Sequence, residues 1–376
     1  MQLKFGDNLM NINNLFLPNY SIGTNAYKNI EEICSNYGKK AVIIGGEKSI
    51  SVSKDGIIKN MGNIKINGVL HYGGVASYEN VDILKNKDEV KDADIIFAVG
   101  GGKSLDTSKT LADLINKPIF AFPTLASNCA SVTSLSVMYN ADGSFKNLFH
   151  QKRPPIHTFI DSNIILNSPE RYFIAGIGDA ASKQYETEFS IRNENLDYNN
   201  FLGYQIIKNC SDDIIKYAVS SLNDFRNKKS SDILNRIVLH IIYTTGLTSV
   251  TMKDDYHISL AHAMYNGLTK IKSVSEKLFH GEIVAYGTLL LLTLDNKNGE
   301  INKVFNFNKS LGLPTSIKDI GIINGKEGIS FNNKELNSAL EGAIAAKDLN
   351  VSPYKIDKDM ILKAIIDLEN YNDSKI

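Results

Sequence analysis

Residues 94–106 of this chain read DIIFAVGGGKSLD, an apolar run followed by three glycines and a polar segment. An apolar run without polar interruption is typical of a strand that is buried on both faces of a parallel sheet. The glycines mark a tight turn, and the residues after them, 104–116, have the spacing of a helix. The stretch therefore predicts a strand–turn–helix unit, from which α/β folds are built.

Similar units surround this stretch. Three further apolar runs are expected to be strands, at 41–46, 68–73 and 118–122. Helices are expected between the strands at 26–37, 77–87 and 104–116. Strands that alternate with helices predict a parallel sheet with helices on both faces. An Asp142-Gly143 turn between 135–139 and 145–149 predicts an additional hairpin.

In the second half of the chain, the apolar residues recur with the period of a helix. Ser168-Pro169-Glu170 combines a cap residue with proline at the first helical position, which indicates a helix start. Helices are expected at 169–191, 213–225, 233–250, 257–269, 281–296 and 357–370. We predict an α/β domain over residues 1–165 and an all-helical domain over 166–376. A cleft between the two domains would be the natural ligand site.

Composition narrows the functional classes. The 376 residues contain 41 basic and 41 acidic side chains, so no charge excess favours nucleic acid or an anionic membrane as a partner. Cys34, Cys129 and Cys210 are too dispersed for a disulfide framework. The most apolar stretch, 289–294, is too short to cross a bilayer, and residues 1–9 do not have the pattern of a signal peptide. We expect a cytoplasmic homo-oligomer that acts on a small molecule.

The glycine turn is a candidate phosphate site. Gly100, Gly101 and Gly102 allow backbone N–H groups to approach a phosphate, and the helix N-terminus adds partial positive charge. Ser104 can cap this helix or donate a hydrogen bond. The spacing is not GxGxxG, and Phe97 stands where a Walker A loop needs glycine. These residues alone leave phosphate binding and a ligand-free turn equally open.

A second glycine pair ends an earlier apolar run. Gly45 and Gly46 are followed by Glu47 and Lys48, at a position where dinucleotide folds often place an acid on the adenosine ribose. On its own, this pattern is better explained as a simple loop.

Three separated residues form a candidate metal site. Asp179 lies in a predicted helix among small and apolar residues, and His262 and Asn266, four residues apart, share a helical face. Asp179, His262 and His280 together offer one carboxylate and two imidazoles. This donor set suits Zn²⁺ or Fe²⁺ and leaves coordination positions open for a substrate oxygen. Spacing alone does not distinguish such ligands from packed histidines.

Taken in order, these segments resemble the iron-containing alcohol dehydrogenase family of the dehydroquinate-synthase-like superfamily, from about Tyr20 to about Gly287. Residues 100–109 resemble the pyrophosphate loop of that family, and 123–128 and 135–139 resemble its nicotinamide segments. Residues 176–179, 262–267 and 280–282 resemble its three metal-ligand segments. The resemblance implies an N-terminal α/β nucleotide-binding domain and a helical C-terminal domain.

The resemblance also implies cofactors, residue roles and an activity. The cofactors would be NAD or NADP and one divalent metal, Zn²⁺ or Fe²⁺. The metal-binding and catalytic residues would be Asp179, His262 and His280, and the substrate contacts would be Cys129 and Tyr265. The cofactor contacts would be Gly46, Lys48, Gly100, Gly101, Gly102, Lys103, Ser104, Asp106, Thr124, Ser127, Ser136, Val137 and Tyr139. The implied reaction is hydride transfer between a small alcohol, polyol or 2-hydroxy acid and its carbonyl form.

Departures from the family pattern refine these expectations. Glycerol dehydrogenases typically have Asp at the position of Cys129, and residues 128–133 resemble the hydroxycarboxylate dehydrogenase branch instead, which favours a small 2-oxo or 2-hydroxy acid. NAD-selective members often have Asp at the position of Gly46, so glycine with Lys48 nearby permits NADPH. Tyr265 stands where many relatives have a second histidine, and its hydroxyl can bind a substrate or simply pack.

Other functions remain as alternatives. A dehydroquinate-synthase-like cyclase or a glycerol-1-phosphate dehydrogenase would need several basic residues for a phosphorylated substrate, and the cyclase usually has Glu as the first ligand. Asp179 and the scarcity of cations near His262, apart from Lys270 and Lys272, count against both. An iron oxygenase would normally carry two histidines and a carboxylate on a β-barrel, and the sequence predicts no β-barrel. A non-enzymatic binding protein with this fold is the remaining alternative.

Overall fold

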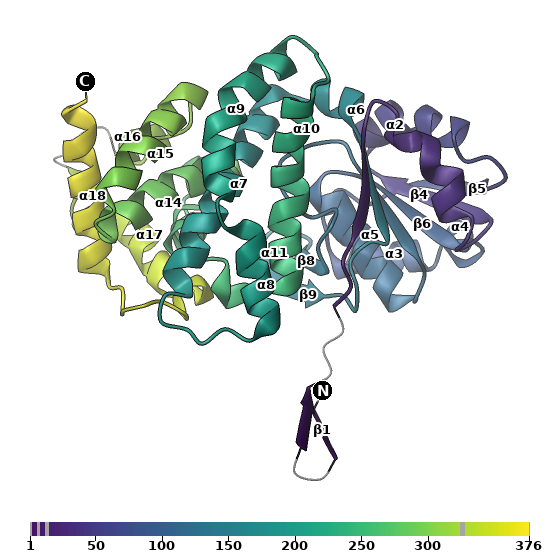
Figure 1. Cartoon of the computed structure of the whole chain (residues 1–376), viewed down its shortest axis with the longest axis horizontal. Helices are drawn as coiled ribbons and strands as arrows, with labels where there is room; N and C mark the ends of the chain where they lie inside the picture. Colours follow the sequence, from purple (N-terminus) through teal and green to yellow (C-terminus); the bar gives the residue numbers. More distant parts are fainter. Residues whose placement is uncertain (1, 6–7, 12–14, 324–327, 376) are drawn as a thin grey trace.

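The computed structural model describes residues 2–5, 8–11, 15–323 and 328–375. The segment 1–9, on which the expectation about a signal peptide depends, lies partly outside these ranges. Figure 1 shows a sheet half and a helical half side by side, with β4, β5 and β6 at one end and α18 at the other. The predicted fold class, an α/β half followed by a helical half, is confirmed.

The sheet half is built on six parallel strands. Their order is β3-β10-β7-β6-β4-β5, and every pair in it is parallel. The strands are β3 (Asn19–Gly23), β4 (Lys40–Gly45), β5 (Lys65–His71), β6 (Ile95–Gly100), β7 (Ile119–Pro123) and β10 (His157–Asp161). The four predicted strands are β4 to β7, whereas β3 and β10 were not predicted.

Apolar side chains on both faces explain why the central strands form. In β6, Phe97 and Val99 point into an aromatic cluster on one face, and Ile96 and Ala98 point into an aliphatic cluster on the other. All four side chains are fully buried. Each large side chain buried in this way contributes about 1.5–3 kcal/mol to folding. A strand buried on both faces has an apolar residue at every position, and this pattern made it recognisable.

The strand β3 lies at an edge and lacks such a pattern. Its sequence, NYSIG, contains only two large apolar residues, and within the described sheet it pairs with β10 alone. Ser21 Oγ lies 2.8 Å from His157 Nε2 on β10, across 136 residues of sequence. The pairing is therefore non-local, and no sequence pattern within either strand predicts it.

Two helices start at the same edge of the sheet. The helix α2 (Glu47–Lys59) follows β4 and leads to β5 on one side, whereas α5 (Gly102–Leu114) follows β6 on the other side. Ile50 and Ile57 of α2 pack on one face of the sheet, and Leu105 and Leu111 of α5 pack on the opposite face. The strand order thus reverses between β4 and β6, and such a switch point is where doubly wound sheets bind ligands.

The remaining elements of the sheet half are short. The predicted hairpin is formed by β8 (Leu135–Tyr139) and β9 (Phe145–His150), which pair antiparallel. A second antiparallel pair, β1 (Gln2–Phe5) and β2 (Asn8–Asn11), lies apart from the body in Figure 1. The other helices are η1 (Ala26–Asn29), α1 (Ile30–Cys34), α3 (Tyr78–Lys85), α4 (Asp88–Lys91) and α6 (Ser162–Leu166). The domain boundary predicted at residues 165/166 falls in α6 and stays a prediction.

Three packed helices form the centre of the helical half: α7 (Glu170–Ser190), α12 (Leu260–Leu268) and α14 (His280–Leu294). Around them lie α8 (Tyr198–Ile207), α9 (Cys210–Arg226), α10 (Asp232–Leu239), η2 (His240–Thr244), α11 (Thr245–Thr251), η3 (Asp254–Tyr256), α13 (Lys272–Ser275), α15 (Asn298–Leu311), α16 (Ile317–Ile320), α17 (Lys334–Ile344), η5 (Lys347–Leu349) and α18 (Lys358–Asp373). After β10, the described residues contain no further strand.

The helix predicted at 233–250 is interrupted by a π-helical turn, η2. By length and composition alone, residues 232–251 are the one described helix that could cross a membrane, and 44% of the relevant window is buried inside the protein. The segment packs against α8 and α9. A core helix of a globular protein has the same apolar character, so this composition is explained by packing.

Candidate metal and nucleotide site

The three predicted metal ligands converge from three helices. Asp179 comes from α7, His262 from α12, and His280 is the first residue of α14. One donor atom from each lies within 4.8 Å of the others. Asp179 Oδ1 is 3.6 Å from His262 Nε2 and 3.4 Å from His280 Nε2. The structure thus brings together residues that lie far apart in the sequence.

Close backbone packing explains how Asp179 meets His280. A Cβ atom at Gly281 would lie 1.8 Å from the carbonyl oxygen of Ala175, and one at Gly178 would lie 2.7 Å from the carbonyl oxygen of Gly281. Only glycine fits at both positions, because α7 and the start of α14 touch backbone to backbone. The glycines that flank the two ligands in sequence therefore set the distance between them.

A buried carboxylate, Glu186, orients His262. Its Oε2 lies 2.6 Å from His262 Nδ1, and its Oε1 accepts hydrogen bonds from the N–H groups of Ser259 and His262. Burial alone would raise the pKa of Glu186, but His262 outweighs burial and the pKa is lowered. A charged Glu186 keeps the proton of His262 on Nδ1 and leaves Nε2 free as a ligand. Sequence reasoning missed Glu186, although it lies seven residues after Asp179 on the same helical face.

The electrostatics of the cluster fit a cation. Burial alone would raise the pKa of Asp179, but attraction to His280, and then to His262 and Lys183, lowers it overall. Asp179 Oδ1 is buried and has no hydrogen-bond partner among the described residues. A buried carboxylate oxygen without a partner is costly unless a cation satisfies it. One carboxylate and two imidazoles are a donor set that suits Zn²⁺ or Fe²⁺.

Both predicted substrate contacts lie beside this cluster. The Tyr265 ring packs edge-on against His280, with the ring centroids 4.2 Å apart. Cys129, from the loop after β7, interacts electrostatically with Lys183 and Asp179, and burial raises the pKa of its thiol. Their roles as substrate contacts stay predictions.

The predicted phosphate loop lies at the switch point. Gly100 has a φ of +136°, which a residue with a side chain rarely adopts, and Gly101 is the N-cap of α5. Of the two roles expected for Ser104, capping this helix or donating a hydrogen bond, the structure shows the second, because its hydroxyl donates to the carbonyl oxygen of Val99 at 2.8 Å. Lys103 is exposed and lies over the ring of Tyr139, 5.6 Å from its centroid.

Further predicted cofactor residues surround the N-terminus of α2. Gly46 is the N-cap of that helix, and a cavity of about 880 Å³ lies beside it, lined in part by Lys48 and Thr124. Thr124 Oγ1 lies 3.2 Å from Ser49 Oγ. The cavity is bordered by both halves of the molecule, since Tyr172 of α7 also lines it. Its volume is in the range of small-molecule and cofactor pockets.

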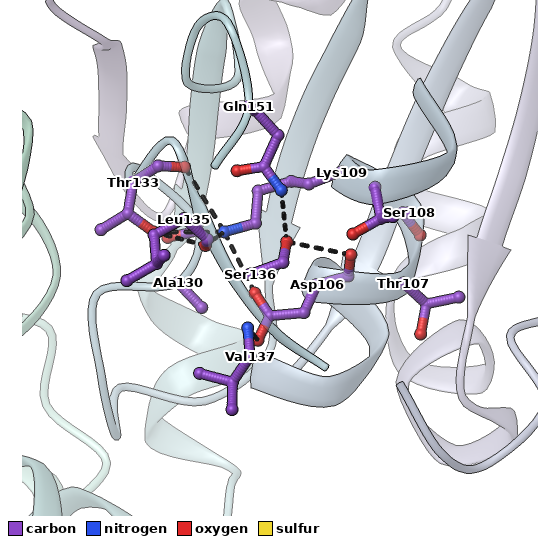
Figure 2. A network of polar contacts seen from close by, with 12 residues as sticks. Asp106, Thr107, Ser108, Lys109, Ala130, Thr133, Leu135, Ser136, Val137 and Gln151 are labelled. Atoms are coloured by element: carbon purple, nitrogen blue, oxygen red, sulfur yellow. Dashed lines mark hydrogen bonds and ion pairs between the residues drawn. The ribbon is translucent and has the colours of Figure 1, made fainter. Parts of the chain in front are cut away.

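Three other predicted cofactor residues belong to a polar network between α5 and the β8–β9 hairpin (Figure 2). Asp106 Oδ2 accepts a hydrogen bond from the N–H of Val137, and Ser136 Oγ donates to the carbonyl oxygen of Asp106. Asp106 Oδ1 lies 3.1 Å from the ammonium group of Lys109, which was not predicted as a site residue. Gln151, from the segment after β9, donates to Ser136 Oγ at 2.6 Å.

The polar groups of this network form hydrogen bonds with one another within the protein. Lys109 also donates hydrogen bonds to Thr133 and to the carbonyl oxygen of Leu135. Cofactor contact by Asp106, Ser136 and Val137 therefore stays a prediction, while their role in anchoring the hairpin is visible. Ser127 is half-buried in the loop after β7, where this loop packs against α7 at Gly176.

A doubly wound sheet with two glycine-capped helices at its switch point, joined to a helical half, is the dehydroquinate-synthase-like fold. In this chain the helical half carries a His₂Asp cluster. Comparison with known proteins agrees. The family described as "Iron-containing alcohol dehydrogenase" matches residues 18–162. The predicted relationship to this family is therefore confirmed.

Individual relatives were found by sequence and by structure. Glycerol dehydrogenase 1 of Schizosaccharomyces pombe is 34% identical over 62% of this chain, and hydroxycarboxylate dehydrogenase A of Escherichia coli is 31% identical over 61% of it. A probable glycerol dehydrogenase from Sinorhizobium meliloti 1021 superposes with a TM-score of 0.83 at 25% identity, over 96% of this chain and 99% of the other. The two sequence matches span 52% and 64% of those relatives' own lengths.

Proposed function

We propose that this chain is a metal-dependent, NAD(P)-linked oxidoreductase that interconverts a small alcohol, polyol or 2-hydroxy acid with its carbonyl form. The observation that carries the proposal is the convergence of Asp179, His262 and His280 on one point, with Glu186 fixing the orientation of His262. The names of the relatives, glycerol dehydrogenase and hydroxycarboxylate dehydrogenase, support the same class of reaction.

The cluster supports a Lewis-acid role. Asp179, His262 and His280 would hold a divalent cation, which when bound would polarise a substrate oxygen and lower the pKa of a substrate hydroxyl. Asp179 offers the cluster a charged oxygen, because its pKa is lowered. Glu186 keeps the Nε2 atom of His262 directed toward Asp179. The side chain of His280 is 38% exposed, against 14% for Asp179, so the open side of the cluster lies at His280.

The switch point supports nucleotide binding. NAD or NADP bound there would accept or donate the hydride, which no side chain can do. Gly100, Gly101 and Gly102 leave backbone N–H groups at the start of α5 available to a pyrophosphate. The N-cap of α2 is glycine, Gly46, rather than an acid, and Glu47 is the first residue of the helix. Glycine at the cap, with Lys48 lining the adjacent cavity, is compatible with a 2′-phosphate.

The proposal is tested by a nicotinamide absorbance assay. Purified protein is assayed with NADH and with NADPH, with and without added Zn²⁺ or Fe²⁺, against short 2-oxo acids, aldehydes and ketones, and in the reverse direction against polyols. We expect turnover that depends on the metal. Nucleotide binding without turnover of any of these compounds would contradict the proposal and would favour the cyclase alternative.

A further inference from the structure

A nearly buried lysine lies beside the metal cluster. Lys183 is four residues after Asp179 on α7 and is only 7% exposed. Its side chain makes no ion pair and no hydrogen bond with any part of the chain that the structure describes. It interacts electrostatically with Cys129, Asp179, Glu186, Asp254, His257 and His262. Lysine is rarely buried unless it is paired, so this position needs an explanation.

A second buried group near Lys183 also lacks a partner. His257 is 5% exposed, and neither of its ring nitrogens has a hydrogen-bond partner among residues 2–5, 8–11, 15–323 and 328–375. Asp254 Oδ1 lies 3.8 Å from its Nε2, beyond hydrogen-bond distance. Burial, followed by the charges of Lys183 and His262, holds the pKa of His257 well below its usual range. The ring is therefore neutral and has one N–H to donate.

Within the described residues, Lys183 and His257 are both hydrogen-bond donors without an acceptor. Two of the carboxylates near Lys183 have other partners, because Glu186 Oε2 lies 2.6 Å from His262 Nδ1 and Asp254 Oδ2 lies 3.5 Å from His150 Nε2. A carboxylate on the substrate would accept hydrogen bonds from Lys183 and from the ring N–H of His257, whereas a neutral polyol would leave the ammonium group without an anionic partner.

We infer that Lys183 and His257 form a subsite for the carboxylate of a 2-oxo or 2-hydroxy acid, next to the metal ligands. Lys183 supplies the charge and His257 supplies a hydrogen bond, so both unpartnered groups gain a partner when the substrate binds. The half-buried thiol of Cys129, which also interacts with Lys183, adds no competing charge there. This inference rests on the proposed oxidoreductase function and names its substrate class.

The kinetic test compares two substrates of nearly the same shape. In 2-oxobutyrate the ketone carries a carboxylate, and in 1-hydroxy-2-butanone it carries a neutral hydroxymethyl group. We expect wild-type protein to prefer the acid. Lys183→Met should lower kcat/KM for the acid by about 100-fold, in line with the loss of a charge-assisted hydrogen bond, and should leave kcat/KM for the ketone nearly unchanged. Lys183→Arg should recover part of the lost activity, and His257→Phe should cause a smaller loss that is also specific to the acid.

A matched control removes a distant charge. Lys216 is exposed on α9, and Lys216→Met should leave both substrates unaffected. Circular dichroism and Tm establish that each variant is folded. Because methionine has a similar length and removes a buried charge, Lys183→Met should fold normally.

A binding measurement gives a readout that does not depend on turnover. Calorimetric titration with oxamate, an unreactive analogue of a short 2-oxo acid, should show binding to wild-type and Lys216→Met protein. The affinity of Lys183→Met should be at least tenfold weaker. Equal oxamate affinity in Lys183→Met and wild type would overturn the subsite.

The kinetic outcomes separate the two proposals. If wild-type protein reduces the neutral ketone as well as the acid, or if Lys183→Met slows both to the same extent, the carboxylate subsite is wrong and the oxidoreductase stands. If wild-type protein reduces neither substrate and no other compound of the assay panel, the proposed function falls and the inference falls with it.

Discussion

His280 occupies a special position among the three ligands. It is the first residue of α14 and its side chain is 38% exposed, whereas those of Asp179 and His262 are 14% and 13% exposed. Partly exposed side chains at a helix start contribute little to packing. A substitution of His280 should therefore affect activity strongly and the free energy of unfolding only slightly.

We predict that His280→Ala abolishes oxidoreductase activity, with a loss of at least about 100-fold, since even residues that only support metal ligands account for 10–100-fold. The change should alter the free energy of unfolding by less than about 1 kcal/mol. Steady-state assays and denaturant titration measure the two effects. His71→Ala, at an exposed histidine far from the cluster, is the control. Full activity of His280→Ala would rule out the metal site.

Gly46 controls the choice of nucleotide in our interpretation. Its backbone has a φ of −80°, and a Cβ atom there would make ordinary contact with the Tyr72 ring at 3.4 Å, so a side chain fits without strain. We predict that Gly46→Asp shifts preference from NADPH toward NADH, because a carboxylate would repel a 2′-phosphate and accept from a ribose hydroxyl. The ratio of kcat/KM for the two nucleotides is the measurement. Gly46→Asn is the uncharged control, and an unchanged ratio in Gly46→Asp would show that this position does not contact the 2′-phosphate.

Sequence reasoning singled out Asp179, His262 and His280, which the structure brings together, but it did not single out the buried residues beside them. Glu186 and Lys183 lie seven and four residues after Asp179, which puts them on the same face of one helix, so the spacing carried a usable signal. No such spacing in the sequence points to His257. Its burial and lack of partners depend on how η3 packs against α7, which is a tertiary contact.

At the scale of elements, α5 is joined to the β8–β9 hairpin through Asp106 and Lys109, two residues of α5 that pair with each other and also hydrogen-bond to Val137 and Leu135 of the hairpin. The side chains of Lys109 and Asp106 are 1% and 9% exposed, and Val137 also donates to Asp106 (Figure 2). Burial raises the pKa of Asp106, and Lys109 opposes that effect. Removal of one partner from a buried pair leaves an uncompensated charge or polar group.

We predict that Lys109→Met lowers the free energy of unfolding by about 3–5 kcal/mol, as expected when a buried pair is broken. The double variant Lys109→Met/Asp106→Asn should recover part of this loss, because no unpaired carboxylate remains. Denaturant titration of the two single variants and the double variant gives the coupling free energy. Simple additivity of the two changes would show that the pair is not coupled.

The β3–β10 pair makes stability depend on pH. Burial lowers the pKa of His157 from 6.5 to about 4, and its ring packs against Phe159. Below pH 6.5 the unfolded chain takes up a proton that the folded protein does not, so this residue destabilises the protein as pH falls from 6.5 to 4.

We predict that His157→Phe flattens the decline in stability between pH 6.5 and pH 4, because the titrating ring is gone. Tm measured across this range in wild-type and variant protein is the test. His71→Phe, at an exposed site, should leave the wild-type slope unchanged. A wild-type slope that persists in His157→Phe would assign the decline to other groups.

Among whole elements, the four central apolar strands and several of the long helices were predictable from their periods. The helices α2, α8, α15 and α17 were missed, as were the short helices α4, α6, α13 and α16. In α2, the sequence EKSISVSKDGIIK contains three serines and a glycine, which are poor helix formers, and only Ser53 and Ile57 are buried. The position of such a helix is set by the strands on either side of it, β4 and β5, rather than by its own residues.

For the whole molecule, the metal cluster joins three helices that are distant in sequence. The unfolded chain holds no such site, so any metal affinity is added to the stability of the folded state. We predict that Zn²⁺ at 100 times its Kd stabilises the protein by about 2.7 kcal/mol, seen as a rise in Tm. EDTA should reverse the rise, and His280→Ala should weaken it. An equal rise in His280→Ala would place the metal elsewhere.

The whole-molecule arrangement was predicted better than its details. A change of period near residue 165 separated the sheet half from the helical half, because the two kinds of secondary structure have different repeats. The sheet order was not predictable in the same way. Pairing of β3 with β10 brings together the two ends of the sheet half, and neither strand contains information about its partner.

That edge pairing has a consequence for synthesis in the cell. β3 leaves the ribosome before β10, so Ser21 must wait for His157, 136 residues later. At typical translation rates of about 5–20 residues per second, the wait is on the order of ten seconds. During that time the nascent strand has an unpaired backbone edge, which is a template for aggregation. β3 would therefore benefit from a chaperone until β10 has been made.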